Sequence, residues 1–207
     1  MDRRAISKMK TGAIVLGGLL ALLPLMAVKV GDTAPDFKGT DSNGKTQSLD
    51  QYRGRYVVLE WHNHDCPFTK KHYESGNMQS LQKTWTVKGV VWLTVISSAP
   101  GQEGYMTAAE ENSYMKKVNA VPTATILDPT GVIGREYGAK TTPDMFVINP
   151  EGKLIYAGAI DDHASTDPED IKTSKNYVSE ALTQAMAGKE VATAVTRPYG
   201  CSVKYAN

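Results

Sequence analysis

The sequence predicts an α/β fold in which a mixed β-sheet is covered by helices. Runs rich in β-branched residues alternate along the chain with segments of helical period, which indicates strand–helix units. Near residue 150 two strand candidates are joined by a tight turn and followed by one more helix, so a hairpin completes the sheet. The 207 residues, 41% hydrophobic and 22% charged, suit one ordinary globular domain.

The first half of the chain contains two short strand candidates, a buried strand and an interrupted helix. A turn cluster at residues 41–44 separates the short strands, and residues 56–61 form a β-rich run typical of a central strand. Pro67 suits the first position of a helix, because its missing N–H has no helical partner there. Residues 76–77 (GN) interrupt the helical pattern, which predicts a kink or a restart at that point.

The second half predicts two more buried strands, a capped helix, a hairpin, an acidic loop and a final amphipathic helix. In chain order these are residues 90–96, a helix starting at 107–110, residues 123–127, hairpin strands 145–148 and 154–159, the loop 161–170, and a helix within 177–186. Thr107 and Glu110 form a capping box, in which each side chain accepts from a backbone N–H of the first turn. The last helix is expected to stop at Gly188.

The N-terminal segment is typical of an export signal. A basic stretch up to Lys10 precedes a mainly apolar run over residues 11–28, which is short for a membrane span and suits a signal-peptide core. We therefore expect residues 1–27 to be a signal peptide or, alternatively, an uncleaved membrane anchor. In both cases residues 28–190 form the domain outside the cytoplasm, in a bacterial periplasm, and residues 191–207 form a C-terminal tail.

The charge balance gives no reason to expect a nucleic-acid partner. The first 27 residues hold four Lys or Arg and one Asp, which leaves 19 of the 23 basic and 21 of the 22 acidic residues for the rest. Such a balanced domain has no basic excess to attract a polyanion. Contact with a membrane is expected only if the N-terminal segment remains uncleaved.

Cys66 is the candidate reactive group. It lies where the strand at 56–61 passes into the helix that begins at Pro67, so backbone N–H groups of the first helical turn favour its thiolate. Lys70 and Lys71 follow one turn later and add positive charge, while Asp65 opposes it. A thiolate attacks disulfides and the O–O bond of peroxides, so the sequence predicts a thiol oxidoreductase. The alternative is a buried, inert cysteine.

Several short motifs occur in a fixed order along residues 30–160. They are Gly31, residues 34–37 (APDF), Asp41, Gly44, Leu49, residues 54–55, 57–59 and Trp61, and then residues 128–131 (DPTG), 137–138, 142–143 and 146–152 (FVINPEG). With these motifs the chain resembles the redoxin and alkyl hydroperoxide reductase/thiol-specific antioxidant families. Residues 63–68 (NHDCPF) and 200–204 (GCSVK) are most similar to a peroxiredoxin-like branch.

The resemblance implies a thioredoxin-like fold with Cys66 at a helix N-terminus and a cis-proline opposite it. Pro122 and Pro143 both precede a β-rich run, and only Pro143 is followed by a hairpin and a closing helix, so we expect Pro143 to be that proline. The resemblance also implies antioxidant or thiol–disulfide exchange activity with a peroxide or disulfide substrate. It implies an external, thioredoxin-like thiol reductant and no cofactor.

The chain departs from its relatives at four positions around Cys66, and the first is Leu59, which stands where peroxiredoxins have a proline. Thr69 stands where thioredoxins have a second cysteine, so a local dithiol is impossible. Asn63 stands where peroxiredoxins have Thr or Ser, and we expect its amide to donate a hydrogen bond instead. Pro143 stands where they have an arginine that orients the peroxide, a role for which Arg135 or Arg197 are candidates.

Cys201 is the only other cysteine in the sequence. It lies in the tail, after Pro198 and Gly200, and about a dozen residues of extended chain after Gly188 can reach across most of a small domain. One interpretation is a resolving thiol that forms an intramolecular disulfide with Cys66. The other is a permanent disulfide that holds the tail to the domain, and the sequence leaves both open.

A metal site is the alternative from another class of function. His62, His64, Cys66 and His72 fall within eleven residues, and imidazole with thiolate suits copper or zinc. Sco-type copper chaperones are redoxin-like proteins that carry metal, although they use two closely spaced cysteines. The acidic loop at 161–170 does not have the spacing of an EF-hand and is expected to be a solvated surface loop.

Overall fold

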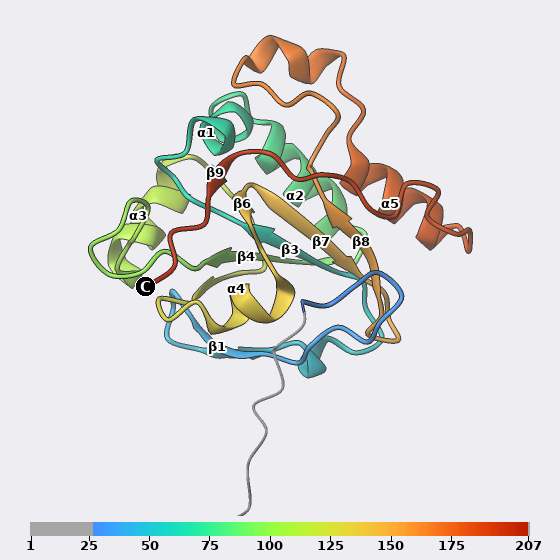
Figure 1. The fold of residues 1–207 in the computed structure, drawn as a ribbon, viewed down its shortest axis with the longest axis horizontal. Coiled ribbons are helices and arrows are strands. Elements are labelled where there is room, and N and C mark those ends of the chain that lie inside the picture. The colour runs from blue at the N-terminus through green and yellow to red at the C-terminus, as the bar shows by residue number, and fades with distance from the viewer. Residues whose placement is uncertain (1–26, 207) are drawn as a thin grey trace, which may run out of the picture.

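A seven-stranded sheet forms the centre of the computed structural model, which describes residues 27–206 (Figure 1). Its strands are β1 (Lys38–Asp41), β2 (Thr46–Ser48), β3 (Val57–Trp61), β4 (Val91–Ile96), β5 (Ala124–Leu127), β7 (Asp144–Ile148) and β8 (Leu154–Gly158), in the order β2-β1-β5-β4-β3-β7-β8. The central three, β3, β4 and β5, are parallel, and the outer pairs are antiparallel. The predicted mixed sheet is therefore confirmed. The predicted export signal lies, except for its last residue, outside the described residues.

Helices cover both faces of the sheet. Side chains of α1 (Pro67–Glu74), α2 (Asn77–Thr86), α3 (Ala108–Lys117) and α5 (Tyr177–Met186) pack together in the core on one face. The other face is covered by α4 (Val132–Tyr137) and by the segment that precedes β1. The chain also forms two short 3-10 helices, η1 (Asp50–Tyr52) and η2 (Pro168–Lys172), and a two-residue strand outside the main sheet, β6 (Thr141–Thr142).

Local sequence signals explain where most of these elements begin and end. Pro67 occupies the first turn of α1, and Gly76 in a left-handed conformation separates α1 from α2. The Thr107–Glu110 capping box is present at the start of α3. Asn176 caps α5 through its side chain, which accepts from the backbone N–H of Ser179 at 2.8 Å. The sequence did not predict α4, because its six residues follow the turn at 128–131 without a capping side chain.

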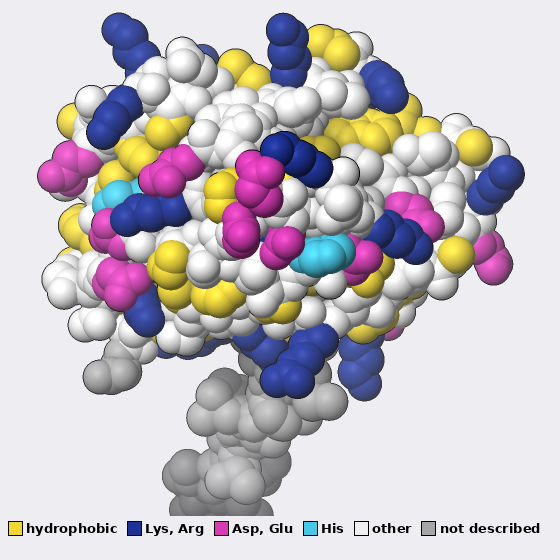
Figure 2. Space-filling model, turned by 90° about the horizontal axis from the view of Figure 1, so that it is seen from above, with side chains coloured by type: hydrophobic (Ala, Val, Ile, Leu, Met, Phe, Trp, Pro, Cys, Tyr) yellow, Lys and Arg dark blue, Asp and Glu magenta, His cyan; other side chains and the backbone are white. Residues whose placement is uncertain are grey.

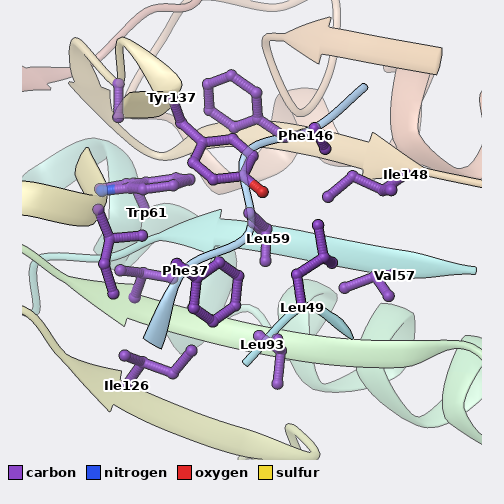
Figure 3. Packing of buried hydrophobic residues seen from close by; sticks show 14 of the residues in the cluster. Phe37, Leu49, Val57, Leu59, Trp61, Leu93, Ile126, Tyr137, Phe146 and Ile148 are labelled. Carbon is purple, nitrogen blue, oxygen red and sulfur yellow. The ribbon is translucent and has the colours of Figure 1, made fainter. Parts of the chain in front are cut away.

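The larger core cluster fixes the end of β3, where the candidate site begins. Trp61 packs its ring against Phe146 of β7 and Tyr137 of α4, with centroids 5.1 and 5.7 Å away (Figure 3). All three side chains are buried, and the Trp61 Nε1–H donates to Ser97 Oγ at 3.0 Å. Edge-on aromatic contacts of this kind hold the strand end in one position. The residues after Trp61 therefore start from a fixed point.

The C-terminal tail is part of the folded domain. Its residue Val195 bridges to Ala157 of β8, and residues Cys201–Ser202 form a strand, β9, that pairs antiparallel with β6. Farther on, the Ala99 N–H donates to the Lys204 carbonyl at 2.8 Å. In Figure 1 the tail crosses from α5 over the top of the sheet to the end of the chain. These strand and backbone contacts hold the tail against the domain.

None of the helices formed by residues 27–206 is both long and apolar enough to cross a lipid bilayer.

Candidate active site

Cys66 occupies the N-cap of α1, immediately after the loop that leaves β3. Its backbone is extended (φ −67°, ψ 122°), and the carbonyl of Cys66 accepts the first helical hydrogen bond from the Lys70 N–H at 2.9 Å. The Cys66 N–H donates back to the Asn63 carbonyl at 3.2 Å. The Cys66 side chain is 0% exposed. The sulfur therefore lies at the helix N-terminus but beneath other residues.

The cis-proline lies against this sulfur. The Thr142–Pro143 peptide bond is cis, as the resemblance implied. The Cys66 thiol donates to the Thr142 carbonyl, with Sγ and O 3.0 Å apart. Residues 76 positions apart in the sequence thus meet at one wall of the site.

Cys201 covers the sulfur from the other side. In the antiparallel pair of β6 and β9, Cys201 stands opposite Thr142. The Cys201 N–H points to Cys66 Sγ, with N and Sγ 3.4 Å apart. Both cysteines are free thiols in this structure. The tail therefore already lies over Cys66, as an internal disulfide requires.

Hydrogen bonding separates the acidities of the two thiols. Burial by itself raises the pKa of Cys66, but hydrogen bonds from Cys201 and Thr142, together with the backbone N–H groups of Thr69 and Cys201, outweigh it and lower the pKa. Burial raises the pKa of Cys201 to about 12, with the hydrogen bond to Cys66 and its charge acting in the same direction. Cys66 is thus the better nucleophile of the pair.

The expected contribution of Lys71 to this acidity is not seen. The Lys71 side chain is buried, and its ammonium group donates to the His163 carbonyl at 3.0 Å. It lies 3.9 Å from the carboxylate of Asp161. The positive charge of Lys71 therefore interacts with the loop that follows β8 and not with the Cys66 sulfur.

We expect the reduced protein to form its two thiolates in two well-separated steps. The lower step belongs to Cys66 and falls below the ~8.5 of a free thiol. The measurement is ultraviolet absorbance of the thiolate against pH, with Cys201→Ser as the matched variant that retains only the lower step. A lower step at or above the free-thiol value would contradict the assignment of Cys66 as nucleophile.

Asn63 does not donate to the Cys66 sulfur as expected, and Thr69 acts on the sulfur through its backbone N–H alone. The Asn63 amide donates to Glu103 Oε1 at 3.2 Å, and its Oδ1 accepts from the Asp65 N–H at 2.8 Å. The expected hydrogen bond from Asn63 to the sulfur is therefore replaced by contacts that shape the loop. The Thr69 hydroxyl is buried and has no hydrogen-bond partner among the described residues, so Thr69 acts on Cys66 through its backbone N–H.

The four residues of the alternative metal site do not converge. His62 is buried between the rings of Tyr73 and Tyr114, 4.8 and 5.5 Å away. His72 Nδ1 faces the Asn77 amide at 2.8 Å. His64 Nε2 lies 3.3 Å from Asp65. Within residues 27–206, no three His, Cys, Asp or Glu side chains are arranged to hold a metal ion.

Neither candidate arginine reaches the sulfur. The Arg135 guanidinium donates to the carbonyls of Thr130 and Ala206 at 2.9 and 2.6 Å. Arg197 is exposed on the tail. Neither of these two residues therefore takes the place of the arginine that orients a peroxide in peroxiredoxins.

Sequence reasoning missed two residues that hold the tail. Tyr199 donates from its hydroxyl to Asp161, and its ring packs edge-on against Phe68 with centroids 5.8 Å apart. Gly200 follows with φ +140°, in contact with the Thr142 backbone. The Tyr-Gly pair before Cys201 was visible in the sequence, but alone it indicates only a turn.

A family profile described as the AhpC/TSA family matches residues 30–157, which is more than half of the chain. The chain belongs to the AhpC/TSA family. A protein of similar sequence is "Thiol-disulfide oxidoreductase ResA" of Bacillus subtilis (strain 168), 29% identical over 129 residues. That match covers 62% of this chain and 66% of ResA, slightly less than two thirds of the relative's length.

Solved structures confirm the thioredoxin-like fold of this AhpC/TSA protein. A hypothetical protein from Sinorhizobium meliloti 1021 superimposes with a TM-score of 0.72 at 20% identity, over 87% of this chain and 97% of the other. The thioredoxin domain of a thiol-disulfide oxidoreductase from Bacteroides vulgatus gives a TM-score of 0.51 at 18% identity, over 71% and 98%. At these identities the likeness speaks for the fold alone.

Proposed function

We propose that this protein is a thiol–disulfide oxidoreductase whose redox-active pair is Cys66 and Cys201. The observation that carries the proposal is the position of Cys201, whose N–H lies 3.4 Å from the Cys66 sulfur. Both cysteines also lie against Thr142, since the Cys66 thiol donates to its carbonyl and Cys201 is its partner in the strand pair. The name of the relative ResA supports the same chemistry.

In the reductive direction the Cys66 thiolate attacks one sulfur of a substrate disulfide. The S–S bond of the substrate breaks, one substrate thiolate leaves, and a mixed disulfide joins Cys66 to the other half. The Cys201 thiolate then attacks the Cys66 sulfur, and the second substrate thiolate leaves with the proton that Cys201 gave up. Two electrons pass from the protein to the substrate, and a Cys66–Cys201 disulfide remains.

The acidities of the two thiols suit this order of events. Burial is the main cause of the raised pKa of Cys201, and the hydrogen bond to Cys66 and the charge of the Cys66 thiolate raise it further. Both effects disappear once Cys66 is bonded to substrate, so the pKa of Cys201 falls when it is needed as the second nucleophile. A thiol reductant in solution, of the thioredoxin-like kind, then reopens the internal disulfide by the reverse steps.

Other residues at the site would hold this pair in place. Pro143 and the Thr142 carbonyl form the wall against the sulfur, and the Thr69 N–H favours the thiolate. Asn63 shapes the loop that carries Cys66. We favour disulfide exchange over peroxide reduction because Asn63 faces Glu103 and Arg135 is engaged near Ala206.

We further propose that the domain works outside the cytoplasm, where disulfide substrates persist. The basic and apolar N-terminal segment supports this. Figure 2, which views the molecule from above, shows acidic and basic side chains intermixed. This face therefore offers no field of one sign to select a charged partner.

A redox titration of the full chain tests the proposal. The protein is equilibrated in glutathione buffers of graded potential, alkylated, and analysed by mass for the linked peptides. We expect an intramolecular Cys66–Cys201 bond with a midpoint less negative than about −300 mV, above the range of permanent structural disulfides. A midpoint below that range would make Cys201 a structural link. Reduction of hydrogen peroxide much faster than of glutathione disulfide would overturn the choice between the two substrates.

A further inference from the structure

A cluster of polar side chains joins the tail to α1. It consists of Lys71, His72, Asp161 and Tyr199, and we call it the latch cluster. Asp161 Oδ1 accepts from the Tyr199 hydroxyl and from the His163 N–H, the latter at 3.0 Å. Asp161 Oδ2 lies 3.9 Å from both Lys71 Nζ and His72 Nε2. The disulfide chemistry described above uses none of these groups.

The latch cluster lies next to both cysteines along the chain. Tyr199 precedes Cys201 by two residues, and Lys71 and His72 belong to the helix that Cys66 caps. The residue between, Gly200, is pressed against Thr142. A tyrosine fixed at Asp161 therefore leaves Cys201 little freedom to move away from Cys66.

Asp161 receives the Tyr199 hydroxyl in an environment with little water. The Asp161 residue is 2% exposed, and burial lowers the pKa of His72 to about 4 so that this imidazole is neutral at neutral pH. A hydrogen bond from a neutral donor to a buried carboxylate is stronger than one between two neutral groups. The loss of the Tyr199 hydroxyl would therefore leave Asp161 Oδ1 with the His163 N–H as its remaining donor.

Access to Cys66 depends on the same contact. Cys66 is 0% exposed, and the Cys201 N–H lies 3.4 Å from its sulfur, so movement of residues 199–202 would uncover the sulfur on that side. The strength of the Tyr199–Asp161 contact then sets how often the site opens. It also sets the local concentration of Cys201 at Cys66.

We infer that Tyr199 is a positioning residue, whose hydrogen bond to Asp161 favours the internal Cys66–Cys201 disulfide and restricts external thiols and disulfides from reaching Cys66. This inference rests on the proposed redox pair. It assigns a role to a side chain outside the reacting atoms. It predicts that loss of the Tyr199 hydroxyl lowers the equilibrium constant of the internal disulfide and raises the rate at which Cys66 is alkylated.

The variant is Tyr199→Phe, which removes the hydroxyl and keeps the ring against Phe68. Against glutathione, we expect the equilibrium constant for the internal disulfide to fall about tenfold, the effect of one hydrogen bond to a charged group. In a Cys201→Ser background, we expect alkylation of Cys66 to become several-fold faster with the same substitution.

The matched control is Tyr205→Phe. Tyr205 belongs to the same tail and donates from its hydroxyl to the Ala139 carbonyl at 2.8 Å, but it lies four residues beyond Cys201. We expect it to leave both quantities within about twofold of the wild type, and urea unfolding of each variant corrects for any global loss of stability. Equal effects of Tyr199→Phe and Tyr205→Phe would overturn the role of Tyr199. The role would also be overturned if Tyr199→Phe lowered both the equilibrium constant of the disulfide and the rate of Cys66 alkylation, or raised both.

The glutathione titration and the alkylation of Cys66 together distinguish a failure of this inference from a failure of the proposed function. If the wild type forms no internal disulfide at any glutathione ratio, the redox pair is wrong. The alkylation arm still decides whether the Tyr199 hydroxyl closes the site. If the disulfide forms equally well in wild type and Tyr199→Phe, the redox pair stands and the positioning role is rejected.

Discussion

Replacing Cys201 with serine is expected to halve the thiolate released from a chromogenic aromatic disulfide and to leave the protein as a mixed disulfide at Cys66. In the reduced wild type, attack by Cys66 releases one aromatic thiolate, and attack by Cys201 on the mixed disulfide releases the second. Serine keeps a hydroxyl near the sulfur but cannot complete the second step. The mass of the product identifies the trapped adduct.

Replacing Cys66 instead is expected to slow the first release by at least about a hundredfold. The remaining thiol, Cys201, has a pKa raised first by burial, so at neutral pH very little of it is thiolate. The rate of the first release, followed by absorbance after rapid mixing, separates the two cysteines. Equal rates for Cys66→Ser and wild type would show that Cys201 is the nucleophile.

Together these two variants distinguish a catalytic pair from a structural link. A structural disulfide would be present before the disulfide reagent is added, and neither thiol would react until a reductant opened it. Both cysteines are free thiols in the structure, and they differ in acidity in the direction that the exchange steps need. The trapped adduct is the direct sign of the order of attack.

Local signals predicted much of the fold and the first half of the site. The β-rich run of β3, the proline at the start of α1 and the capping box at Thr107 each act over a few residues, so the sequence shows them directly. The family resemblance implied a cis-proline opposite Cys66, and the hairpin and helix that follow Pro143 selected it over Pro122. These features need no knowledge of distant contacts.

The second half of the site depends on pairings between distant residues, which no local pattern reveals. Strand β9 is two residues long, and it exists because its partner is β6, about 60 residues earlier. The direction of the Asn63 amide is decided by Glu103 on another loop. Glu60, in the middle of β3, is tolerated there because Tyr73 and Trp92 each donate to its carboxylate at 2.7 Å.

The position of Gly200 makes the docking of the tail sensitive to a single methyl group. A Cβ at residue 200 would lie 2.1 Å from the Thr142 carbonyl oxygen and 2.8 Å from its carbon. Both are backbone atoms in the wall of the site, so neither can move without moving the cis-proline segment. The φ of +140° adds strain for any residue with a side chain.

We therefore expect Gly200→Ala to release β9 from β6 while the rest of the domain stays folded. The seven-stranded sheet and its helices make their contacts without residue 200, so the midpoint of thermal unfolding should change little. Cys201 would lose its place opposite Thr142. The equilibrium constant for the Cys66–Cys201 disulfide should fall at least about a hundredfold, a cost of roughly 3 kcal/mol that combines clash and backbone strain.

Gly188→Ala is the matched control for this prediction. Gly188 also has a positive φ, +71°, and starts the same tail, but a Cβ there meets no atom within 4 Å. Its substitution carries backbone strain of about 1 kcal/mol without a clash at the site. Titration of both variants against glutathione, with Cys66 alkylation as the second readout, distinguishes the effect of the clash at Thr142 from the effect of backbone strain. If Gly200→Ala pairs its cysteines as well as Gly188→Ala does, then β9 does not lie against β6 in solution, and Cys201 must reach Cys66 by another path.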